Sequence, residues 1–537
     1  MTFKERIRLI SQKKQSTILS ASLVLAITFS ISSILGLLRN RFLYAKFFSC
    51  CVDQLDVYNA AFRLPDLIFK LLVTGVLSAS FIPVFSSYLH KSKKVADEIA
   101  STVINLLLIT FFIISLIAYI FINPISHLIA AGFSPDQLVL MASLSRILLI
   151  AQIFFLLSNF ITAILQVNQN FIIPALSPIV YNLFIIISIF TLAPIFGIYG
   201  VAIGAVVGAF FHLAIQIPVL RRQGFIYYPI IRTKLNGVKE VFRLMVPRIL
   251  SLGLGEIENT VTLFFASSLA SGSISLLNLA LQFMYWPSRI FGTTVGQASL
   301  PILSKNIAKN ELNTFRNTVN RIIIQSLFIA IPVAVLILVE RVSIIRILYG
   351  SRQFPWAATI LTSRILAFLT PGIICQAVIQ ILIRSFYALH NTKVPFFVST
   401  VSLIINVLTS FYFVNFTNLG VIGLAISASI GNLIQLFGLL IMFIKIVDGF
   451  NWSLMFSKFY KILISSILMG ISSWLTIKFL DLFILDTAHV IPVLTLMLIS
   501  SFIGLITYIF SVSFLKLEEI KDYKKYYFKF KDFIFRK

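Results

Sequence analysis

Apolar runs of membrane-spanning length recur along this chain from residue 17 to residue 515, with only brief polar breaks between them. A transmembrane helix needs about 20 mostly apolar residues to cross a bilayer. Hydrophobic residues make up 58% of the chain and charged residues 12%, which leaves too little polar surface to cover a water-soluble globule. We predict an all-α integral membrane protein of about fourteen transmembrane helices. The predicted spans are 17–38, 57–89, 99–122, 138–167, 172–195, 199–219, 243–270, 276–303, 319–341, 357–389, 394–415, 419–446, 458–480 and 488–515.

The placement of the basic residues orients these spans. The net charge is +25, and one set of alternate connections is rich in lysine and arginine, which makes those connections cytoplasmic by the positive-inside rule. Five of the opposite connections lack both residue types: 123–137, 196–198, 271–275, 416–418 and 481–487. The opposite connection 342–356 holds Arg346 and Arg352, and we interpret it as an amphipathic segment at the outer surface. Both termini fall on the cytoplasmic side. The cytoplasmic connections carry Lys91, Lys93, Lys94, Arg221, Arg222, Arg232, Lys234, Lys305, Lys309, Arg316, Lys393 and Lys458.

The sequence contains no pattern typical of an enzyme. Cys50, Cys51 and Cys375 are too few for a disulfide framework or a cysteine-based zinc site, and the five histidines have no metal-ligand spacing. No loop carries a nucleophile with a base, a phosphate-binding glycine loop or paired catalytic carboxylates. We therefore expect a transporter with no enzymatic activity and no nucleic-acid partner.

An internal repeat divides the chain. Asn170 to Pro174 and Asn391 to Pro395 each open a span, and the spans that follow begin with Gly197-Ile-Tyr-Gly200-Val-Ala202 and Gly420-Val-Ile-Gly423-Leu-Ala425. Six spans separate the copies, so the two halves have the same orientation and form a parallel repeat. The alternative is that glycine-rich helix pairs recur because small residues permit close packing. In such architectures the substrate cavity lies between the two bundles.

The repeat predicts a domain organisation of two six-helix lobes with additions. The predicted parts are a basic cytoplasmic N-terminus (1–16), an N-terminal lobe (17–220), a cytoplasmic linker (221–242), a C-terminal lobe (243–446), two further transmembrane helices (458–515) and a basic cytoplasmic tail (516–537).

Polar residues in the 57–89 span follow a helical period. Spacings of three and four residues confine them to a stripe of about 80° on an α-helix. Charges at membrane depth usually face a cavity or a partner, so the stripe predicts a cavity lining. The alternative is a ladder of pairs along the helix itself. The stripe comprises Asp56, Asn59, Arg63, Asp66, Lys70 and Thr74, and Pro65 within it would bend the helix.

Three other spans contain polar candidates. Arg39 and Arg41 end the 17–38 span, where snorkelling to the interface is the alternative role. Glu256 and Glu258 lie among further oxygen-bearing side chains and could hold a sodium ion or a proton, or else bond to Arg248 or another helix. Around Pro287 the 276–303 span adds the candidate substrate contacts Gln282 and Arg289.

Several short motifs occur in a specific order. They are Ile34-Leu-Gly-Leu-Leu-Arg39-Asn40, Leu55-Asp56-Val-Tyr, Ala61-Phe-Arg-Leu-Pro65-Asp-Leu, Ser78-Ala-Ser-Phe-Ile-Pro83, Trp286-Pro287-Ser288, Leu300-Pro301-Ile-Leu-Ser304-Lys305 and Arg384-Ser-Phe-Tyr-Ala388. This pattern resembles the MurJ (MviN) lipid II flippase family over most of the chain. The resemblance implies the multidrug/oligosaccharidyl-lipid/polysaccharide exporter fold. It also implies alternating-access transfer of undecaprenyl-diphosphate-linked disaccharide-pentapeptide from the inner to the outer leaflet of the bacterial cytoplasmic membrane.

At the positions where the family has charged site residues, this chain has the matching residue at only some of them. Arg39, Asp56 and Lys70 stand where the family has an arginine, an aspartate and a basic residue. The resemblance thus assigns Arg39 and Lys70 to the diphosphate, with Asp56 and Asp66 orienting these cations. The chain departs from the family at five positions. Ser33 replaces an arginine, Asn40 an acid, Phe69 the first residue of an Arg-Arg pair, Thr74 a glutamate and Gln282 an arginine.

The competing functions are a flippase for another polyprenyl-linked glycan, a cation-coupled multidrug exporter and a non-transporting membrane scaffold. The polar stripe argues against a scaffold, because scaffolding does not need charges at membrane depth. We expect a polyprenyl-diphosphate-linked substrate, a functional monomer and cell-wall synthesis enzymes as partners. We expect no cofactor, with a monovalent cation or the membrane potential as the coupling force.

Overall fold

The computed structural model describes residues 18–74, 77–351, 353–447, 452–487, 489–517 and 519. The secondary structure of these residues is helical, apart from an isolated bridge between Ser351 and Phe354. The chain forms two compact units, Met1–Ser275 (unit 1) and Leu276–Lys537 (unit 2). The predicted N-terminus 1–16 and the stretch 520–537 of the predicted tail lie outside the described residues.

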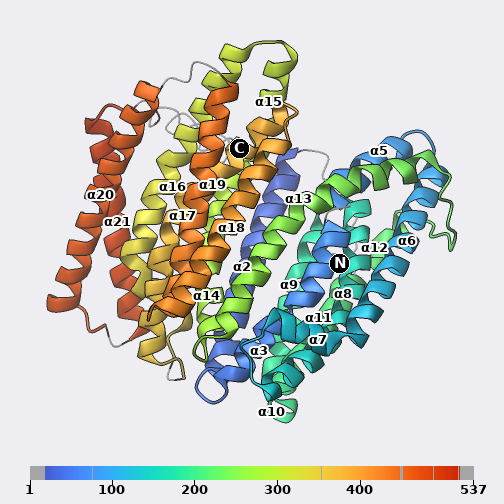
Figure 1. The fold of residues 1–537 in the computed structure, drawn as a ribbon, viewed down its shortest axis with the longest axis horizontal. Helices are drawn as coiled ribbons and strands as arrows, with labels where there is room; N and C mark the ends of the chain where they lie inside the picture. Colours follow the sequence, from blue (N-terminus) through green and yellow to red (C-terminus); the bar gives the residue numbers. More distant parts are fainter. Residues whose placement is uncertain are drawn as a thin grey trace, which may run out of the picture. The chain divides into compact units, whose positions relative to one another are not determined.

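Unit 1 consists of long helices and one interrupted helix, coloured blue to green in Figure 1. The interrupted helix replaces a single 57–89 span and runs through two π-helical segments, η1 and η2. The elements of unit 1 are α2 (Ile18–Phe47), α3 (Val52–Ala61), α4 (Arg63–Phe69), η1 (Lys70–Thr74), η2 (Leu77–Phe81), α5 (Ile82–Leu89), α6 (Lys93–Ile120), α7 (Ile122–Ile129), α8 (Pro135–Val167), α9 (Ile172–Thr191), α10 (Ala193–Phe196), α11 (Ile198–Ala214), α12 (Ile217–Arg222) and α13 (Asn236–Ser267).

Unit 2 repeats this plan, including an interrupted helix with a π-helical segment. Helix α14 begins three residues before the unit boundary. The elements are α14 (Ser273–Ser288), η3 (Arg289–Thr294), α15 (Val295–Ala308), α16 (Leu312–Tyr349), α17 (Trp356–Ala388), α18 (Lys393–Phe416), α19 (Val421–Ile446), α20 (Trp452–Phe483) and α21 (Val490–Phe514).

The all-α membrane architecture is confirmed. Within the described residues, ten helical stretches are long and apolar enough to cross a bilayer. They coincide with ten of the predicted spans. The other four predicted spans fall on α2, on the interrupted helix α3 to α5, on α13, and on α14 to α15. The exact number of fourteen transmembrane helices stays a prediction.

The backbone confirms the repeat in detail. Gly197 and Gly420, the residues before α11 and α19, have φ, ψ of 57°, −137° and 54°, −132°. Only glycine adopts this region readily. Gln169 and His390 both have a positive φ, 59° and 55°, at the turns that precede α9 and α18. Identical rare conformations at equivalent positions are not explained by general glycine enrichment.

Helix α13 shows that repeat and packing divide the chain at different places. By the repeat it opens the predicted second lobe at residue 243. In the structure it begins at Asn236 and packs against α5, α6, α7, η1 and η2, all of which belong to unit 1. Helix α13 therefore lies against the π-helical segments of the interrupted helix that carries the stripe.

Each unit has its own aromatic core. In unit 1, the ring of Phe81 stacks on Phe85 at 5.4 Å between centroids and meets Phe160 edge-on at 5.2 Å. In unit 2, Phe443 contacts Phe386 at 5.9 Å and Phe315 at 6.2 Å. Lipid tails are as apolar as these side chains, so close packing rather than escape from water holds such cores together.

Two sequence-based boundaries are wrong. Helix α2 continues to Phe47, so Arg39 lies within the helix and not at its end. Segment 342–356 is not a separate surface segment, because α16 continues through Arg346 to Tyr349. The Arg346 guanidinium lies 5.3 Å from the centroid of the Trp356 ring. In both cases a charge ended the predicted span, whereas a local contact accommodates that charge within the helix. Arg352 lies outside the described residues.

Candidate functional site: a polar cavity in unit 1

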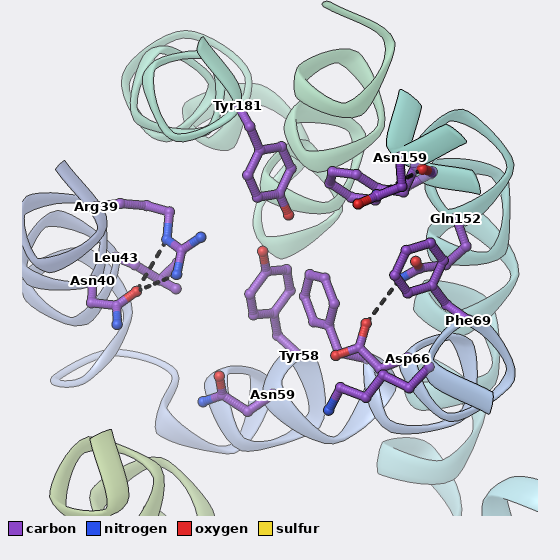
Figure 2. Close-up of a pocket in the computed structure, with 14 residues that line it drawn as sticks. Arg39, Asn40, Leu43, Tyr58, Asn59, Asp66, Phe69, Gln152, Asn159 and Tyr181 are labelled. Carbon is purple, nitrogen blue, oxygen red and sulfur yellow. Dashed lines mark hydrogen bonds between the residues drawn. The ribbon is translucent and has the colours of Figure 1, made fainter. Parts of the chain in front are cut away.

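A cavity of about 490 Å³ lies inside unit 1, with walls from α2, α3, α4, η1, α8 and α9 (Figure 2). Its size is typical of a ligand pocket. Charged, carboxamide and aromatic side chains line it together. The lining residues are Arg39, Asn40, Leu43, Tyr58, Asn59, Phe62, Asp66, Phe69, Lys70, Ala151, Gln152, Phe155, Asn159 and Tyr181.

Arg39 projects from α2 into one side of this cavity. Its guanidinium donates to Asn40 Oδ1 from two nitrogens, at 3.1 and 3.0 Å, and to Asn182 Oδ1 at 3.1 Å. These partners are neutral, and no carboxylate among the described residues forms an ion pair with Arg39. The positive charge of Arg39 is therefore held in place but not neutralised.

Asp66 and Lys70 line the cavity from α4 and η1. Gln152 Nε2 of α8 donates to Asp66 Oδ1 at 2.8 Å, on the side of the cavity away from Arg39 (Figure 2). The Lys70 ammonium lies 3.3 Å from Glu256 Oε1, and the Lys70 side chain remains 41% exposed. An ammonium that is paired on one side and exposed on the other can still meet an anionic ligand.

Arg63 does not line the cavity, and its side chain joins α4 to α13. It forms an ion pair with Glu256 Oε2 at 2.8 Å and donates to Thr260 Oγ1 at 2.8 Å and to the Glu256 carbonyl. The Arg63 and Glu256 side chains are only 9% and 13% exposed. Removing one partner from this largely buried pair would leave an uncompensated charge, and would therefore destabilise the contact between α4 and α13.

Asp56 bonds to a connection rather than to a cation. Its carboxylate accepts from the backbone amides of Gly272 and Ser275, at 2.7 and 2.8 Å, where α14 begins. Unpaired amides at the start of a helix favour a carboxylate at this point. Asn59 donates to Ser275 Oγ at 3.0 Å, and the Tyr44 hydroxyl donates to the Ser275 carbonyl at 3.0 Å. Asp56 therefore fixes the α13–α14 connection.

The chain has clear relatives. The sequence profile of the lipid II flippase MurJ family matches residues 52–493, which is most of the chain. The chain belongs to the lipid II flippase MurJ family. A probable lipid II flippase MurJ from Bdellovibrio bacteriovorus is 27% identical over 470 residues, covering 86% of this chain and 88% of that protein.

Solved structures agree with this assignment. The structure of a lipid II flippase MurJ in an inward closed conformation has a TM-score of 0.75 and 27% identity, and covers 92% of this chain and 98% of that one. An inward-facing multidrug resistance MATE family transporter of the MOP superfamily has a TM-score of 0.64 at 15% identity, over 80% of this chain and 99% of that one. The second likeness shows a shared fold alone.

Asn40 and Phe69, two of the five positions at which the resemblance implies a departure from the family, both line the cavity. The Asn40 amide supports Arg39, and the Phe69 ring packs against Phe155 with centroids 6.2 Å apart. At these two positions the wall of the cavity is uncharged.

The predicted stripe divides into separate groups. Asn59, Asp66 and Lys70 reach the cavity, whereas Arg63 turns to α13 and Asp56 to the α13–α14 connection. The α-helix is interrupted at Phe62 and becomes π-helical at Lys70, so a constant angle per residue does not apply. The side chain of Thr74 lies outside the described residues.

Two candidates belong to unit 2. Gln282 on α14 accepts from the Tyr349 hydroxyl at 3.5 Å, and Arg289 is an exposed residue at the start of η3. Neither lines the cavity of unit 1. A role for Gln282 or Arg289 in substrate binding stays a prediction.

The carboxylates proposed for ion coupling have different environments. Glu256 contacts Arg63 and Lys70, while Glu258 is two residues further on α13, and residues at that spacing project to different sides of a helix. A cation at Glu256 would have to displace Lys70 or Arg63. The described residues contain no cluster of three or more histidine, cysteine or acidic side chains that could hold a metal ion. Coupling through Glu256 and Glu258 stays a prediction, and the side chain of Arg248 lies outside the described residues.

The residues that sequence reasoning missed are the neutral ones. Tyr58, Gln152, Phe155, Asn159 and Tyr181 complete the cavity, and four of the five come from α8 and α9. None of the five carries a charge, so a search for charged residues within the spans passes over them. The usable signal was the number of carboxamides in these two spans, because a carboxamide at membrane depth needs a partner or a cavity.

Proposed function

We propose that this chain moves lipid II from the inner to the outer leaflet of the bacterial cytoplasmic membrane by alternating access. Membership of the MurJ family supports this function. The observation that carries the proposal is the Arg39 guanidinium, which projects into the cavity without a carboxylate partner among the described residues. Such a cation is suited to one class of ligand, an anionic headgroup.

The chemistry of the substrate explains why a cavity is needed. A diphosphate with two sugars cannot cross hydrocarbon unaided, because removing its charges from water costs several kcal/mol per ion even after relaxation. In our proposal Arg39 binds the diphosphate, and Lys70 adds a second contact from η1. Asp66 lies one helical turn before Lys70, at a spacing that lets a carboxylate attract an ammonium. The prenyl tail stays in lipid, so only the headgroup needs polar shelter.

The basic connections support cytoplasmic termini and a multi-pass inner-membrane location. The driving force in the proposal is the membrane potential, which is worth about 2.3 kcal/mol per charge per 100 mV, or a monovalent cation gradient. We propose that the chain acts as a monomer and delivers its substrate to cell-wall synthesis enzymes outside.

The decisive experiment is depletion of the protein in its own host, followed by measurement of the lipid-linked intermediate that accumulates in the cytoplasmic leaflet. We expect lipid II to accumulate, and expression of the wild-type chain to restore its transfer and normal cell shape. Unchanged lipid II transfer after depletion would refute the proposal. Accumulation of a different polyprenyl-linked glycan would support the second candidate, for which the neutral Asn40 and Phe69 provide a specific reason.

Ion coupling needs a separate test. Transport in proteoliposomes is measured with sodium replaced by potassium, and with the proton gradient collapsed, for the wild-type chain and for Glu258→Gln. If the carboxylates couple transport to an ion, one replacement slows the wild-type chain and has a smaller effect on the variant. Indifference of the wild-type chain to both gradients would remove Glu256 and Glu258 as coupling residues.

A further inference from the structure

We propose that the cavity of unit 1 contains a carbohydrate subsite, in which Tyr58 and Tyr181 recognise the sugar that is attached to the polyprenyl diphosphate. This inference rests on the proposed function and deepens it. It assigns the two ends of the headgroup to different residues, with the phosphate at Arg39 and the sugar between the two tyrosines.

The first argument is the chemistry of the wall. Apart from Arg39, Asp66 and Lys70, every polar group that lines the cavity is a carboxamide or a phenol. Asp66 already accepts from Gln152, and Lys70 is already paired with Glu256. Carboxamides and phenols both donate and accept hydrogen bonds, as do sugar hydroxyl and acetamido groups, whereas a phosphate only accepts. The neutral polar groups are Asn40, Tyr58, Asn59, Gln152, Asn159 and Tyr181.

The second argument is that two hydroxyls lack partners. Tyr58 is only 5% exposed and Tyr181 is half-buried, yet neither hydroxyl has a hydrogen bond to any described residue. Figure 2 shows both hydroxyls pointing toward one another into the cavity, between Arg39 on one side and Gln152 and Asn159 on the other. Buried phenols normally have a partner, so two that face an open space are prepared for a ligand with hydrogen-bonding groups.

The third argument is the rigid aromatic surface. The Tyr58 ring meets Phe62 edge-on at 5.1 Å, and Phe155 contacts both Tyr181, at 5.0 Å, and Phe69, at 6.2 Å. These contacts fix the rings before a ligand arrives. A pyranose ring has apolar C–H faces and polar edges, so it matches a pocket that combines aromatic surfaces with a few convergent polar groups. A bare phosphate would leave the aromatic surface unused.

The experiment compares three ligands that share one lipid. They are undecaprenyl diphosphate, the same lipid with the disaccharide but no peptide, and complete lipid II. Binding to the purified full chain in nanodiscs is measured for the wild type and for the Tyr58→Phe/Tyr181→Phe double variant, which keeps both rings. Tyr412→Phe, on α18 of unit 2 and 56% exposed, is the matched control.

We expect the double variant to bind both sugar-bearing lipids about tenfold more weakly, because it loses two hydrogen bonds, and to bind undecaprenyl diphosphate as the wild type does. Retained binding of undecaprenyl diphosphate also shows that the variant is folded. Tyr412→Phe should change none of the three affinities. If the double variant does not purify as a monodisperse protein, each single variant is expected to show about a threefold loss with the same ligand pattern.

Three results would overturn the carbohydrate subsite. They are equal losses for all three ligands, no loss for any of them, and a loss that appears only when the peptide is present. In each of these cases the wild-type chain still binds lipid II, so the proposed function is untouched. A wild-type chain that binds none of the three lipids would instead refute the proposed function itself.

Discussion

The interrupted helices of the two units have similar backbone features but carry different side chains. Each has a proline near the break, Pro65 or Pro287, followed by a π-helical segment, η1 or η3. Aligning these prolines places Arg63 opposite Tyr285. The remaining counterparts in unit 2 are also uncharged. They are Asn278 for Asp56, Ser288 for Asp66 and Gly292 for Lys70.

The neighbouring helix explains the difference. A Cβ atom on Gly292 would lie 2.9 Å from the Gln376 carbonyl and 3.0 Å from Ala377 Cα, so α17 packs directly on η3. At the equivalent point of unit 1, Lys70 faces a cavity that α8 lines with Gln152 and Phe155. The π-helical distortion therefore belongs to the repeat and does not depend on charge. In unit 1 the charged Lys70 occupies this position because the facing helix α8 leaves a cavity beside it.

The largest effect on stability is expected from breaking the Arg63–Glu256 ion pair. The position opposite Arg63 in unit 2 is the uncharged Tyr285. Arg63→Ala leaves Glu256 with Lys70 alone in a buried site, and removing one partner of a buried pair costs about 3–5 kcal/mol. Unfolding of the purified protein by heat or denaturant measures the loss. Tyr285→Phe, the matched change in unit 2, should alter stability by less than about 0.5 kcal/mol.

A double variant tests whether the cost is truly one of unpaired charge. Arg63→Met combined with Glu256→Met should recover most of the lost stability, because similar apolar volume replaces both charges. An Arg63→Ala protein as stable as the wild type would mean that the pair does not fasten α13 to α4, and the contrast between the units would lose its structural basis.

The second effect concerns transport. Arg39→Ala should abolish complementation and slow lipid II transfer about thirtyfold, because a hydrogen bond to a charged group contributes about 2 kcal/mol. Arg289→Ala should cost much less, since Arg289 does not line the cavity of unit 1. Membrane insertion is checked by immunoblotting, and Lys445→Ala, an exposed cation at the end of α19, is the control. Equal losses for Arg39→Ala and Arg289→Ala would show that unit 2 contributes as strongly as unit 1.

A pair of glycines sharpens the comparison further. An alanine Cβ at Gly208 would lie 2.9 Å from the Tyr181 carbonyl, whereas one at Gly431 would lie 3.3 Å from side-chain atoms of Asn406. We expect Gly208→Ala to destabilise the protein by about 1–3 kcal/mol and Gly431→Ala by less than about 1 kcal/mol, because a side chain yields more easily than a backbone. Thermal unfolding of both variants gives the answer, and the reverse order would contradict it.

The smallest effect is expected at Gln282. Gln282→Leu loses the long hydrogen bond that Gln282 accepts from the Tyr349 hydroxyl, at 3.5 Å, and should slow transport by less than about threefold. The transport assay used for Arg39→Ala measures it. A loss comparable to that of Arg39→Ala would add Gln282 to the binding residues and extend the site into unit 2.

Much of the fold could be predicted from local sequence. Apolar run length gives the helices, and repeated glycines give the equivalent turns, since Gly197 and Gly420 share a conformation that other residues rarely adopt. The broken course of the 57–89 span could be predicted only as a bend at Pro65. The π-helical segments depend on how neighbouring helices pack, and this information lies far away in the chain.

The sequence by itself determined that this chain is a helical membrane protein with an internal repeat and a concentration of charge near Arg39 and the 57–89 span. Tertiary structure alone decided which charges are partners. Arg63 pairs with Glu256, 193 positions away in the sequence, and Asp56 accepts a hydrogen bond from the Gly272 amide. Arg39 has neutral partners and faces a cavity. The physical reason is that burial and pairing depend on the facing helix, whereas hydropathy and periodicity describe each helix alone.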